Sequence, residues 1–269
     1  MRERAPSSGP KVSASVCPVA HVPFSFCGSL ETTVRVLSRL GYNGFELLLR
    51  RSDDANPRIL ESLVSRYEMT LAAIGTGLAA MEGLSLSSPS ESIRQKAVAR
   101  VLNFSKLAEA FDCPVIVGSI KGQPGKASSQ RALGKSLQQL KGLRAVLEPM
   151  NRYESPFLNT AAEAASFIRK NELRDVGILL DSFHMNIEEP SMPGAIAMAG
   201  NLLKHVHIAD SNRNAPGKGH IPFLQLLRAL NRVRYDQYLS AEILQAPCSE
   251  VVLAETIRFL RSMVHKTYL

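Results

Sequence analysis

The fold is decided by four short apolar runs, each ending in or closely followed by an acidic residue or a histidine: RAVLEP (Arg144–Pro149), VGILLDSFH (Val176–His184), LKHVHIAD (Leu203–Asp210) and YLSAEI (Tyr238–Ile243). They recur about every 25 to 35 residues, which is the spacing of repeated strand–helix units. Because the carboxyl ends of all strands lie on one face of a parallel barrel, the polar residues are predicted to converge at its mouth. These residues are Glu148, Asp181, His207 and Glu242. Three carboxylates and one imidazole suit a divalent ion such as manganese or magnesium.

The rest of the chain continues this alternation. Further strands are expected near residues 12–16, 44–49, 71–74 and 115–117, and helices near residues 30–40, 59–67, 90–110, 130–140, 160–169, 193–200, 222–230 and 250–264. Ser90 is placed to cap the helix that follows it. The pattern predicts an α/β fold, a (β/α)8 TIM barrel, in a single domain over residues 11–269 after a flexible N-terminal tail of residues 1–10.

Composition places the chain among ordinary globular proteins, with 269 residues, 45% apolar and 21% charged. No apolar run reaches membrane length, and the N-terminus has no apolar segment of the secretory kind. The four cysteines (Cys17, Cys27, Cys113 and Cys248) are scattered and form no CxxC pair. The scattered cysteines predict a reduced, cytoplasmic protein. We also expect a small-molecule partner, and neither a nucleic acid nor a membrane.

The net charge of +8 is concentrated between Arg94 and Arg144, where ten Lys and Arg residues face only Glu109 and Asp112. We interpret this stretch as the solvated outer face of two helices. The alternative is attraction of phosphorylated substrates or nucleic acid. Only Phe104 and Phe111 are aromatic there, which argues against a platform for stacking bases.

The two glutamates of the quartet predict more than metal ligation. A single acid at a strand end is more often a hydrogen-bonding loop residue, but four such residues on successive strands favour a shared cation. A metal that holds the carbonyl and the neighbouring hydroxyl of a ketose acidifies the carbon between them. Glu148 or Glu242 could remove that proton, and the other could return one to the opposite face, which inverts the stereocentre.

Four longer segments resemble the tagatose/psicose (ketose) 3-epimerase family, a branch of the xylose-isomerase-like TIM barrels: LEPMNRYES (Leu147–Ser155), LLDSFHMNIEE (Leu179–Glu189), HVHIADSNRNAPGKGHIPF (His205–Phe223) and SAEI (Ser240–Ile243). The resemblance implies that the quartet binds one divalent ion (manganese, magnesium or cobalt), with Glu148 and Glu242 as the catalytic acid/base pair. It also implies that Glu154, His184 and Arg213 contact substrate oxygens, and that the protein is a homodimer or homotetramer.

Other functions on the same barrel remain open from the sequence. A hydroxypyruvate-type isomerase or an inosose-type dehydratase would use similar proton abstraction. A DNA-repair enzyme like endonuclease IV uses a three-zinc cluster held by several additional histidines, but none of the six histidines here lies near the expected strand ends Ile74–Gly77 and Val117–Gly122. A non-catalytic relative would be expected to lack one of the two glutamates. Candidates for the far end of the substrate are Phe24, Phe26, Glu46 and Gly77, although Glu46 could equally make a structural hydrogen bond.

Overall fold

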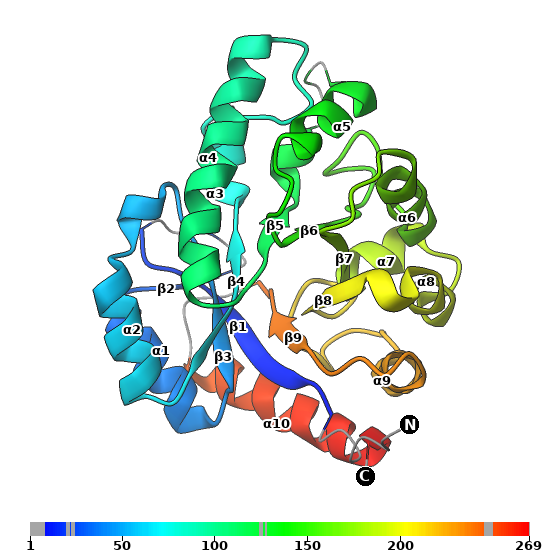
Figure 1. Ribbon diagram of the computed structural model, residues 1–269. Helices are drawn as coiled ribbons and strands as arrows, with labels where there is room; N and C mark the ends of the chain where they lie inside the picture. Colours follow the sequence, from blue (N-terminus) through cyan, green and yellow to red (C-terminus); the bar gives the residue numbers. More distant parts are fainter. Residues whose placement is uncertain are drawn as a thin grey trace, which may run out of the picture.

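The computed structural model describes residues 9–19, 22, 25–123, 126, 128–244 and 250–268. Parallel strands follow one another around a barrel, and the last pairs back with the first (Figure 1). The barrel strands are β1 (Lys11–Cys17), β3 (Gly44–Leu48), β4 (Thr70–Gly75), β5 (Val115–Val117), β6 (Ala145–Leu147), β7 (Val176–Asp181), β8 (Leu203–Ile208) and β9 (Tyr238–Ala241). A short strand, β2 (Phe26–Cys27), pairs with the end of β1. The predicted (β/α)8 barrel is confirmed.

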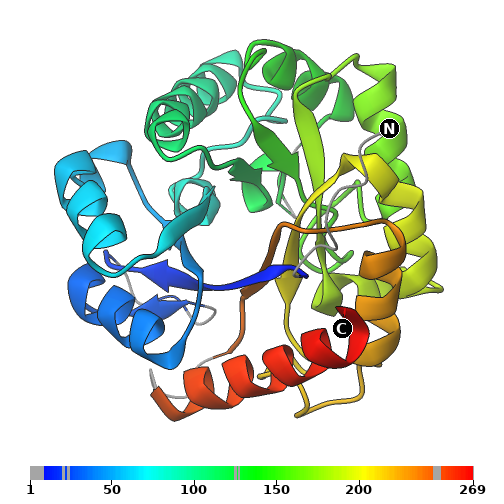
Figure 2. The same ribbon diagram turned by 60° about the horizontal axis from the view of Figure 1, so that its bottom comes forward.

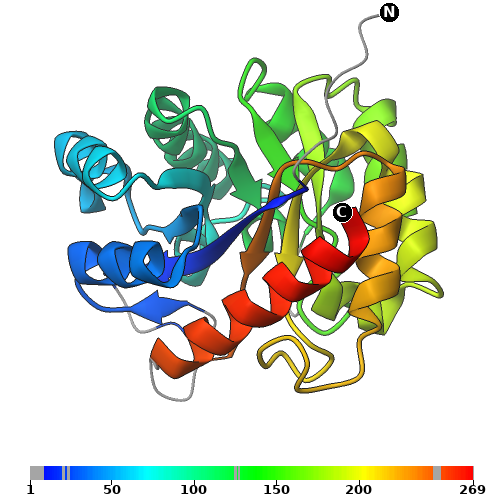
Figure 3. The ribbon, with the colours of Figure 1, turned by 90° about the horizontal axis from the view of Figure 1, so that it is seen from below.

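Helices form a ring around the strands (Figures 1 and 2). They are α1 (Leu30–Leu40), α2 (Pro57–Arg66), α4 (Glu91–Ala110), α5 (Gln130–Gln138), α6 (Ala161–Lys170), α8 (Met192–Ala199), α9 (Phe223–Arg232) and α10 (Glu250–Tyr268). The closing helix α10 packs against α1 and α9, and in Figure 3 it runs below β1 in the view. The described residues also form the 3-10 turns η1 (Ser52–Asp54), η2 (Ser119–Lys121) and η3 (Gly200–Leu202).

Two short helices at the barrel mouth were not predicted. Helix α3 (Gly77–Met81) lies just after β4, and α7 (Ser182–Glu188) follows β7. The Asp181 side chain caps α7 by accepting a hydrogen bond from the backbone N–H of Phe183 at 2.7 Å. Both helices are too short to show a full hydrophobic period, so their sequences are read as loops.

Helix ends follow local chemistry at most positions. Ser29 caps α1 by accepting from the N–H of Thr32, and Gly41 ends the helix in the left-handed region at φ 91°. Ser90 does occupy the position before α4, as expected, but its side chain makes no capping hydrogen bond. That part of the prediction was wrong: Ser90 instead donates its own N–H to the hydroxyl of Ser88.

The barrel interior contains a small layer of its own beneath the mouth. Ala73, Ile116, Val146 and Leu179, from four successive strands, form a buried cluster separate from the main core between strands and helices. Close-packed interior layers of this kind make a TIM barrel a solid core rather than a pore. This packed layer therefore gives rigid support to the site residues at the mouth of the barrel.

Several predictions concern the ends of the chain. Residues 1–8 of the expected tail lie outside the described residues, as do Phe24 and Cys248, whereas Gly9 and Pro10 are buried. A Cβ on Gly9 would lie 3.0 Å from Val264 and 3.2 Å from Tyr268, so the chain here runs against α10. The division into a tail and one barrel domain stays a prediction. Within the described ranges, no helix has both the length and the apolar character needed to span a membrane.

Candidate metal centre

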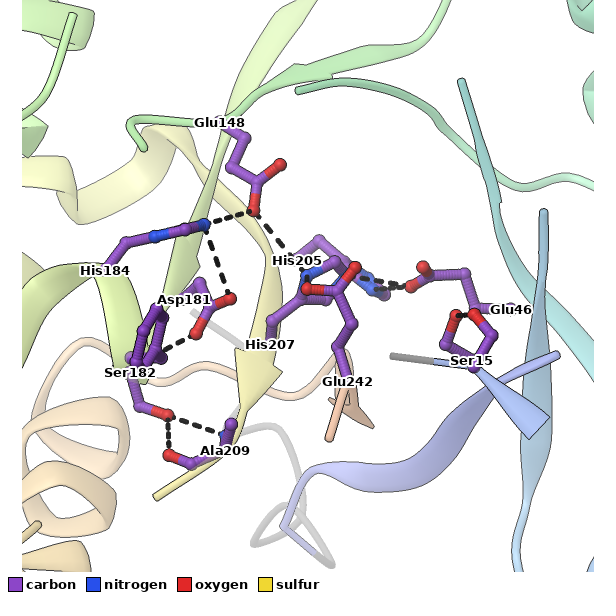
Figure 4. Close-up of polar contacts among 12 residues, drawn as sticks. Ser15, Glu46, Glu148, Asp181, Ser182, His184, His205, His207, Ala209 and Glu242 are labelled. Carbon is purple, nitrogen blue, oxygen red and sulfur yellow. Dashed lines mark hydrogen bonds and ion pairs between the residues drawn. The ribbon is translucent and has the colours of Figure 1, made fainter. Parts of the chain in front are cut away.

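The four predicted ligands meet at the carboxyl ends of the last four strands. Glu148 directly follows β6, Asp181 ends β7, His207 lies in β8 and Glu242 follows β9. One donor atom from each lies within 4.8 Å of the others, and Figure 4 shows the side chains turned toward one another. The backbone N–H of Glu148 donates to the carbonyl of Val117 at 3.1 Å, so the short segment before β6 does seat this residue at the mouth.

Two of these donor atoms are buried without any hydrogen-bond partner among the described residues: Nδ1 of His207 and Oδ2 of Asp181. The Nδ1 atom lies 3.7 Å from Oε1 of Glu148 and 3.6 Å from Oε2 of Glu242. Buried polar atoms without partners are costly, and a cation between them would satisfy all four residues. Three oxygen donors and one nitrogen fit manganese, magnesium or cobalt.

Glu46 fixes the orientation of the ligating histidine. Its Oε2 lies 2.9 Å from Nε2 of His207 and 3.0 Å from Nε2 of His205, on the side of His207 away from the other ligands (Figure 4). A carboxylate can only accept, so Nε2 of His207 carries a proton and Nδ1 is the atom turned toward the other ligands, where a metal would take the place of its proton. Burial lowers the pKa of His207, but the charges of Glu46 and Glu242 outweigh it and hold this pKa well above its usual value. The sequence left two roles open for Glu46, a substrate contact and a structural hydrogen bond, and gave no signal for His205. Glu46 makes the hydrogen bonds and also lines the cavity described below, so both roles stay open.

Burial and charge move the pKa values of the carboxyl groups in different directions. Burial raises the pKa of Glu148 to about 8 and that of Asp181 to about 6. Burial acts on Glu242 in the same direction, but His207 and Arg213 outweigh it and hold the pKa of Glu242 below its usual value. Carboxyl groups that lie this close together retain protons when no cation is present. The raised pKa values therefore indicate a site that is suited to bind a cation.

His184 presents a fixed hydrogen-bond donor to the same space. The Asn151 carbonyl oxygen accepts from the N–H groups of Tyr153 and Glu154, so its amide nitrogen faces Nδ1 of His184 at 2.8 Å. Nδ1 is therefore the acceptor, and Nε2 carries the proton. Nε2 lies 3.8 Å from carboxylate oxygens of Glu148 and Asp181, and burial keeps the pKa of His184 well below its usual value.

Arg213 links two acidic residues across the mouth. Its guanidinium donates to Oε2 of Glu242 at 2.6 Å and to Oε1 of Glu154 at 3.0 Å, and it stacks 4.7 Å from the ring centre of Phe183. The backbone of Arg213 is in the left-handed region at φ 59°, in a turn closed by its N–H and the carbonyl of Asp210. A non-glycine residue held in this region is often part of a functional loop.

These residues line a cavity of about 160 Å³. Glu148, Glu154, His184, His207, Arg213 and Glu242 lie on one side of it. The other side consists mainly of small and apolar residues: Val22, Leu48, Gly75, Thr76, Gly77, Leu78, Met81, Ile116, Gly118 and Ser119. Of the candidates for the far end of the substrate, Gly77 and Glu46 do line the cavity. Phe26 does not, because it is buried in the main core.

Position 118 requires a glycine because the side chain of Glu148 packs directly against its backbone. A Cβ at this position would lie 2.3 Å from Oε2 of Glu148, closer than any real contact. The backbone of Gly118 also has the unusual angles φ −92°, ψ −114°. This requirement could not be predicted from the sequence, because Gly118 and Glu148 are 30 residues apart.

One residue of the basic stretch contradicts the sequence interpretation. Of the ten cations, nine are exposed or partly exposed, but Lys121 is completely buried in η2. It does not belong to the outer face of a helix. Its neighbours Ser119 and Gly118 line the cavity, whereas Lys121 itself is not among the lining residues.

Known proteins resemble the chain in both sequence and fold. The model of the xylose isomerase-like TIM barrel family matches residues 34–263. The D-psicose 3-epimerase of Ruminiclostridium cellulolyticum is 30% identical over 223 residues, which is 76% of this chain and 74% of that protein. The 3-dehydro-D-guloside 4-epimerase of Escherichia coli is 42% identical over 101 residues, 38% of each chain. A crystal structure of D-psicose 3-epimerase with D-tagatose from Clostridium cellulolyticum has a TM-score of 0.80 at 22% identity, covering 94% of this chain and 99% of that one.

Proposed function

The chain belongs to the xylose isomerase-like TIM barrel family, and we propose that it is a metal-dependent sugar epimerase that acts as a ketose 3-epimerase. One observation carries the proposal: Glu148 and Glu242 flank the unpartnered Nδ1 of His207 at 3.7 Å and 3.6 Å. Relatives that match most of their length bear 3-epimerase names, which supports the same activity.

The proposed ligands of the divalent ion are Glu148, Asp181, His207 and Glu242. When bound, the ion supplies Lewis-acid polarisation of a carbonyl and its neighbouring hydroxyl. The chain contributes the fixed lone pair of His207, held by Glu46 at 2.9 Å, and a rigid strand end for each oxygen donor. Manganese, magnesium and cobalt all fit this donor set.

Glu148 and Glu242 are proposed to exchange the proton at carbon 3. They reach the cavity from β6 and β9, on different sides of His207 (Figure 4). One carboxylate takes the proton and leaves an enediolate, and the other gives a proton to the opposite face of the same carbon. Returning a proton to the opposite face inverts that stereocentre. One conversion leaves the first glutamate protonated and the second ionised, and proton exchange with solvent restores both before the next turnover in the same direction.

Three further residues are proposed to hold the substrate oxygens. His184 offers its neutral Nε2–H, fixed by Asn151, and Arg213 offers its guanidinium beside Glu154. Donors fixed before the substrate arrives stabilise developing negative charge without reorganisation. Binding through oxygens on two adjacent carbons would keep carbon 3 between the two glutamates.

Other chemistries on this barrel are less well supported. The trinuclear site of an endonuclease IV-like enzyme needs further histidines at neighbouring strands, but the described cavity lining at the ends of β4 and β5 contains none. No contact favours an isomerase or a dehydratase over an epimerase, so these are separated by the experiment below. A homodimeric or homotetrameric assembly and a cytoplasmic location remain part of the proposal.

Solvent exchange tests the proposal directly. The manganese-loaded protein is incubated with a panel of ketoses in deuterated water and followed by NMR. Deuterium at carbon 3 together with a new epimer is expected. Exchange at carbon 1 with an aldehyde product would indicate an aldose–ketose isomerase instead, and loss of water from the substrate would indicate a dehydratase. No exchange at all in a panel that includes acidic and phosphorylated ketoses would overturn the proposed function.

A further inference from the structure

The carboxylate of Glu46 uses only one of its two oxygen atoms within the protein. Oε2 accepts from Nε2 of His205 at 3.0 Å and from Nε2 of His207 at 2.9 Å, and Figure 4 shows both contacts meeting on this atom. Oε1 accepts no hydrogen bond from the described residues, yet it is not among their side-chain atoms that lie fully buried without a partner. Oε1 is therefore a free acceptor that keeps contact with open space.

That open space is the cavity of the proposed metal centre. Glu46 is 1% exposed, and it lines this cavity. A Cβ placed on Gly75, which also lines the cavity, would lie 3.9 Å from Oε1. The free oxygen thus lies beside the cavity wall, on the part of the carboxylate that the two imidazoles leave unoccupied. A molecule bound in the cavity has access to it.

Glu46 is also held rigidly before any ligand arrives. Two N–H groups fix Oε2, and the rings of His205 and His207 that carry them pack edge to face with their centres 5.3 Å apart. Hydrogen bonds donated to Oε2 stabilise the ionised carboxylate over the neutral acid. An ionised acceptor that is fixed in advance forms a charge-assisted hydrogen bond with a donor at little further ordering cost.

The wall around Oε1 is otherwise uncharged. The described lining between residues 48 and 119 consists of Leu48, Gly75, Thr76, Gly77, Leu78, Met81, Ile116, Gly118 and Ser119. The hydroxyl of Thr76 is engaged within the protein, because it donates to the carbonyl of Ile116 at 2.7 Å. Ser119 carries the other side-chain hydroxyl of this wall. On this side of the cavity, Glu46 is therefore the strong acceptor for a ligand.

The position of Glu46 indicates which part of a substrate it meets. The imidazole of His207 lies between Glu46 and the other proposed ligands, because Nε2 faces Glu46 while Nδ1 faces Glu148 and Glu242. A sugar whose reacting carbon lies between these two glutamates reaches Glu46 with a hydroxyl farther along its chain. Such a contact recognises the substrate and takes no part in the proton transfer.

We propose that Oε1 of Glu46 accepts a hydrogen bond from a substrate hydroxyl beyond the reacting carbon, which makes a free hydroxyl at that position a condition for efficient turnover. The inference deepens the proposed function and rests on it. An analogue without that hydroxyl leaves an ionised acceptor unpaired in a confined site, and such sites reject the analogue far more strongly than apolar sites reject a missing methylene. A carboxylate or phosphate at the same position places like charge against Glu46, so the preferred substrate is neutral there.

Deoxy sugars test the requirement in the wild-type protein. The best ketohexose of the panel is compared with its 4-deoxy, 5-deoxy and 6-deoxy forms at saturating manganese. One of the three should lose about 10²-fold or more in kcat/KM, whereas the other two should stay within about fivefold of the parent sugar. Values within about fivefold for all three deoxy sugars would overturn the proposal.

Glu46→Gln separates this contact from the support of His207. With its amide oxygen turned toward the two imidazole N–H groups, the glutamine presents its NH2 group to the cavity, so a donor replaces the acceptor. The discrimination against the sensitive deoxy sugar should fall at least about tenfold, because an unpaired neutral amide costs less than an unpaired carboxylate. A Glu46 that only holds His207 would change the rates of all four sugars by one factor and leave their ratios as in wild type, which contradicts the inference. Glu46→Ala is the second variant if the first does not fold.

Ser119→Ala is the matched control, because Ser119 lines the same wall and carries a hydroxyl. This variant should discriminate against the deoxy sugar as wild type does. If discrimination is lost in Ser119→Ala but kept in Glu46→Gln, Ser119 holds the substrate hydroxyl and the assignment to Glu46 is wrong.

Binding of unreactive polyols distinguishes this inference from the proposed function. Hexitols have no carbonyl and cannot epimerise. D-Glucitol and its monodeoxy forms are titrated by calorimetry into manganese-loaded wild type and Glu46→Gln. A loss of at least about tenfold in affinity for one deoxy form, reduced in the variant, supports the contact even if no ketose exchanges its carbon-3 proton, a result that would reject the epimerase alone. Epimerisation with equal affinities and equal rates for all deoxy forms keeps the epimerase and rejects the contact.

Discussion

The two halves of the barrel mouth differ sharply in chemistry. Strands β6 to β9 contribute buried carboxyl groups and histidines that contact one another, whereas β3 to β5 contribute mainly small and apolar residues such as Leu48, Gly77 and Leu78. The half formed by β6 to β9, which we call the charged half, is suited to holding a cation and moving protons. The half formed by β3 to β5, which we call the apolar half, is suited to shaping the rest of the cavity. The difference indicates that reaction type and substrate choice are determined by separate parts of the chain, and substitutions in each half should have separable effects.

The largest effect is expected from the two glutamates of the charged half. Glu148→Gln and Glu242→Gln each remove one acid/base group while keeping an oxygen that can bind metal, so epimerisation should fall by about 10²- to 10⁴-fold. Each variant should still exchange the carbon-3 proton of one epimer, because the other glutamate can remove and return it on the same face. The two variants should retain exchange in opposite epimers. This is measured by NMR in deuterated water, with bound metal determined for each protein; normal turnover in either variant would exclude the two-glutamate mechanism.

The next largest effect is expected in the pH dependence of metal binding by the charged half. The pKa of Glu148 is raised to about 8 and that of Asp181 to about 6, so protons must leave when a metal binds. Manganese affinity should therefore fall at least tenfold per pH unit below pH 8 and more steeply below pH 6. The displaced protons are those of Glu148 and then Asp181, and His207, whose pKa is also raised, must lose its Nδ1 proton.

Stability of the metal-free protein should change in a defined direction. A pKa raised by folding contributes stability at pH values below the unfolded value, and this contribution is lost as pH rises through the folded value. For Glu148 the window runs from 4.5 to about 8. Thermal unfolding of metal-free protein should thus occur at a lower temperature at pH 8 than at pH 5, and added manganese should reverse the difference. Glu148→Gln, which cannot titrate, is the control.

A third test separates orientation from charge at Glu46. Glu46→Ala removes the acceptor that fixes His207, and loss of such a partner typically weakens metal binding about 10- to 100-fold. Glu46→Gln keeps an acceptor oxygen and should recover part of that affinity. Manganese binding is measured by calorimetry for both variants. If Glu46→Ala binds manganese as tightly as wild type, the hydrogen bond at 2.9 Å does not control the ligand.

The last four strands were predictable from sequence because their signal is local. A polar residue at the end of an apolar run, repeated at the spacing of strand–helix units, identifies Glu148, Asp181 and Glu242 in a parallel barrel. The resemblance of short motifs then implied roles for Glu154, His184 and Arg213, and the structure places all three around the same cavity. Their roles remain proposals.

Functional contacts between distant segments could not be predicted in this way. Glu46 meets His207 across a separation of 161 residues, and Gly118 is fixed by a contact with Glu148 that no local pattern encodes. Lys121 stands in a charged stretch whose other members are mostly solvated, so composition predicted exposure. Burial of a single cation depends on how a 3-10 turn packs, which hydrophobic periodicity does not report.

Gly118 connects the two halves, so its substitution should have an intermediate effect. Gly118→Ala places a Cβ where Oε2 of Glu148 now lies and must displace that carboxylate. Turnover should fall about tenfold or more, since small misplacements of reacting groups are costly, and stability should fall by about 1–3 kcal/mol. Gly194→Ala in α8 is the matched control, because its Cβ would make only ordinary contacts at 3.4 Å. Equal behaviour of the two variants would show that Glu148 tolerates displacement.

The smallest effect is expected at the rim of the apolar half. Met81 lines the cavity but is 73% exposed, so Met81→Ala removes little buried surface and touches no charged group. We expect KM to rise by about threefold or less and kcat to stay unchanged, because the lost contact contributes equally to substrate and transition state. Steady-state kinetics on the best ketose of the panel measures both constants. A fall in kcat with unchanged KM would mean that the apolar half also positions the reacting carbon, and that the division between the two halves is less complete than their composition indicates.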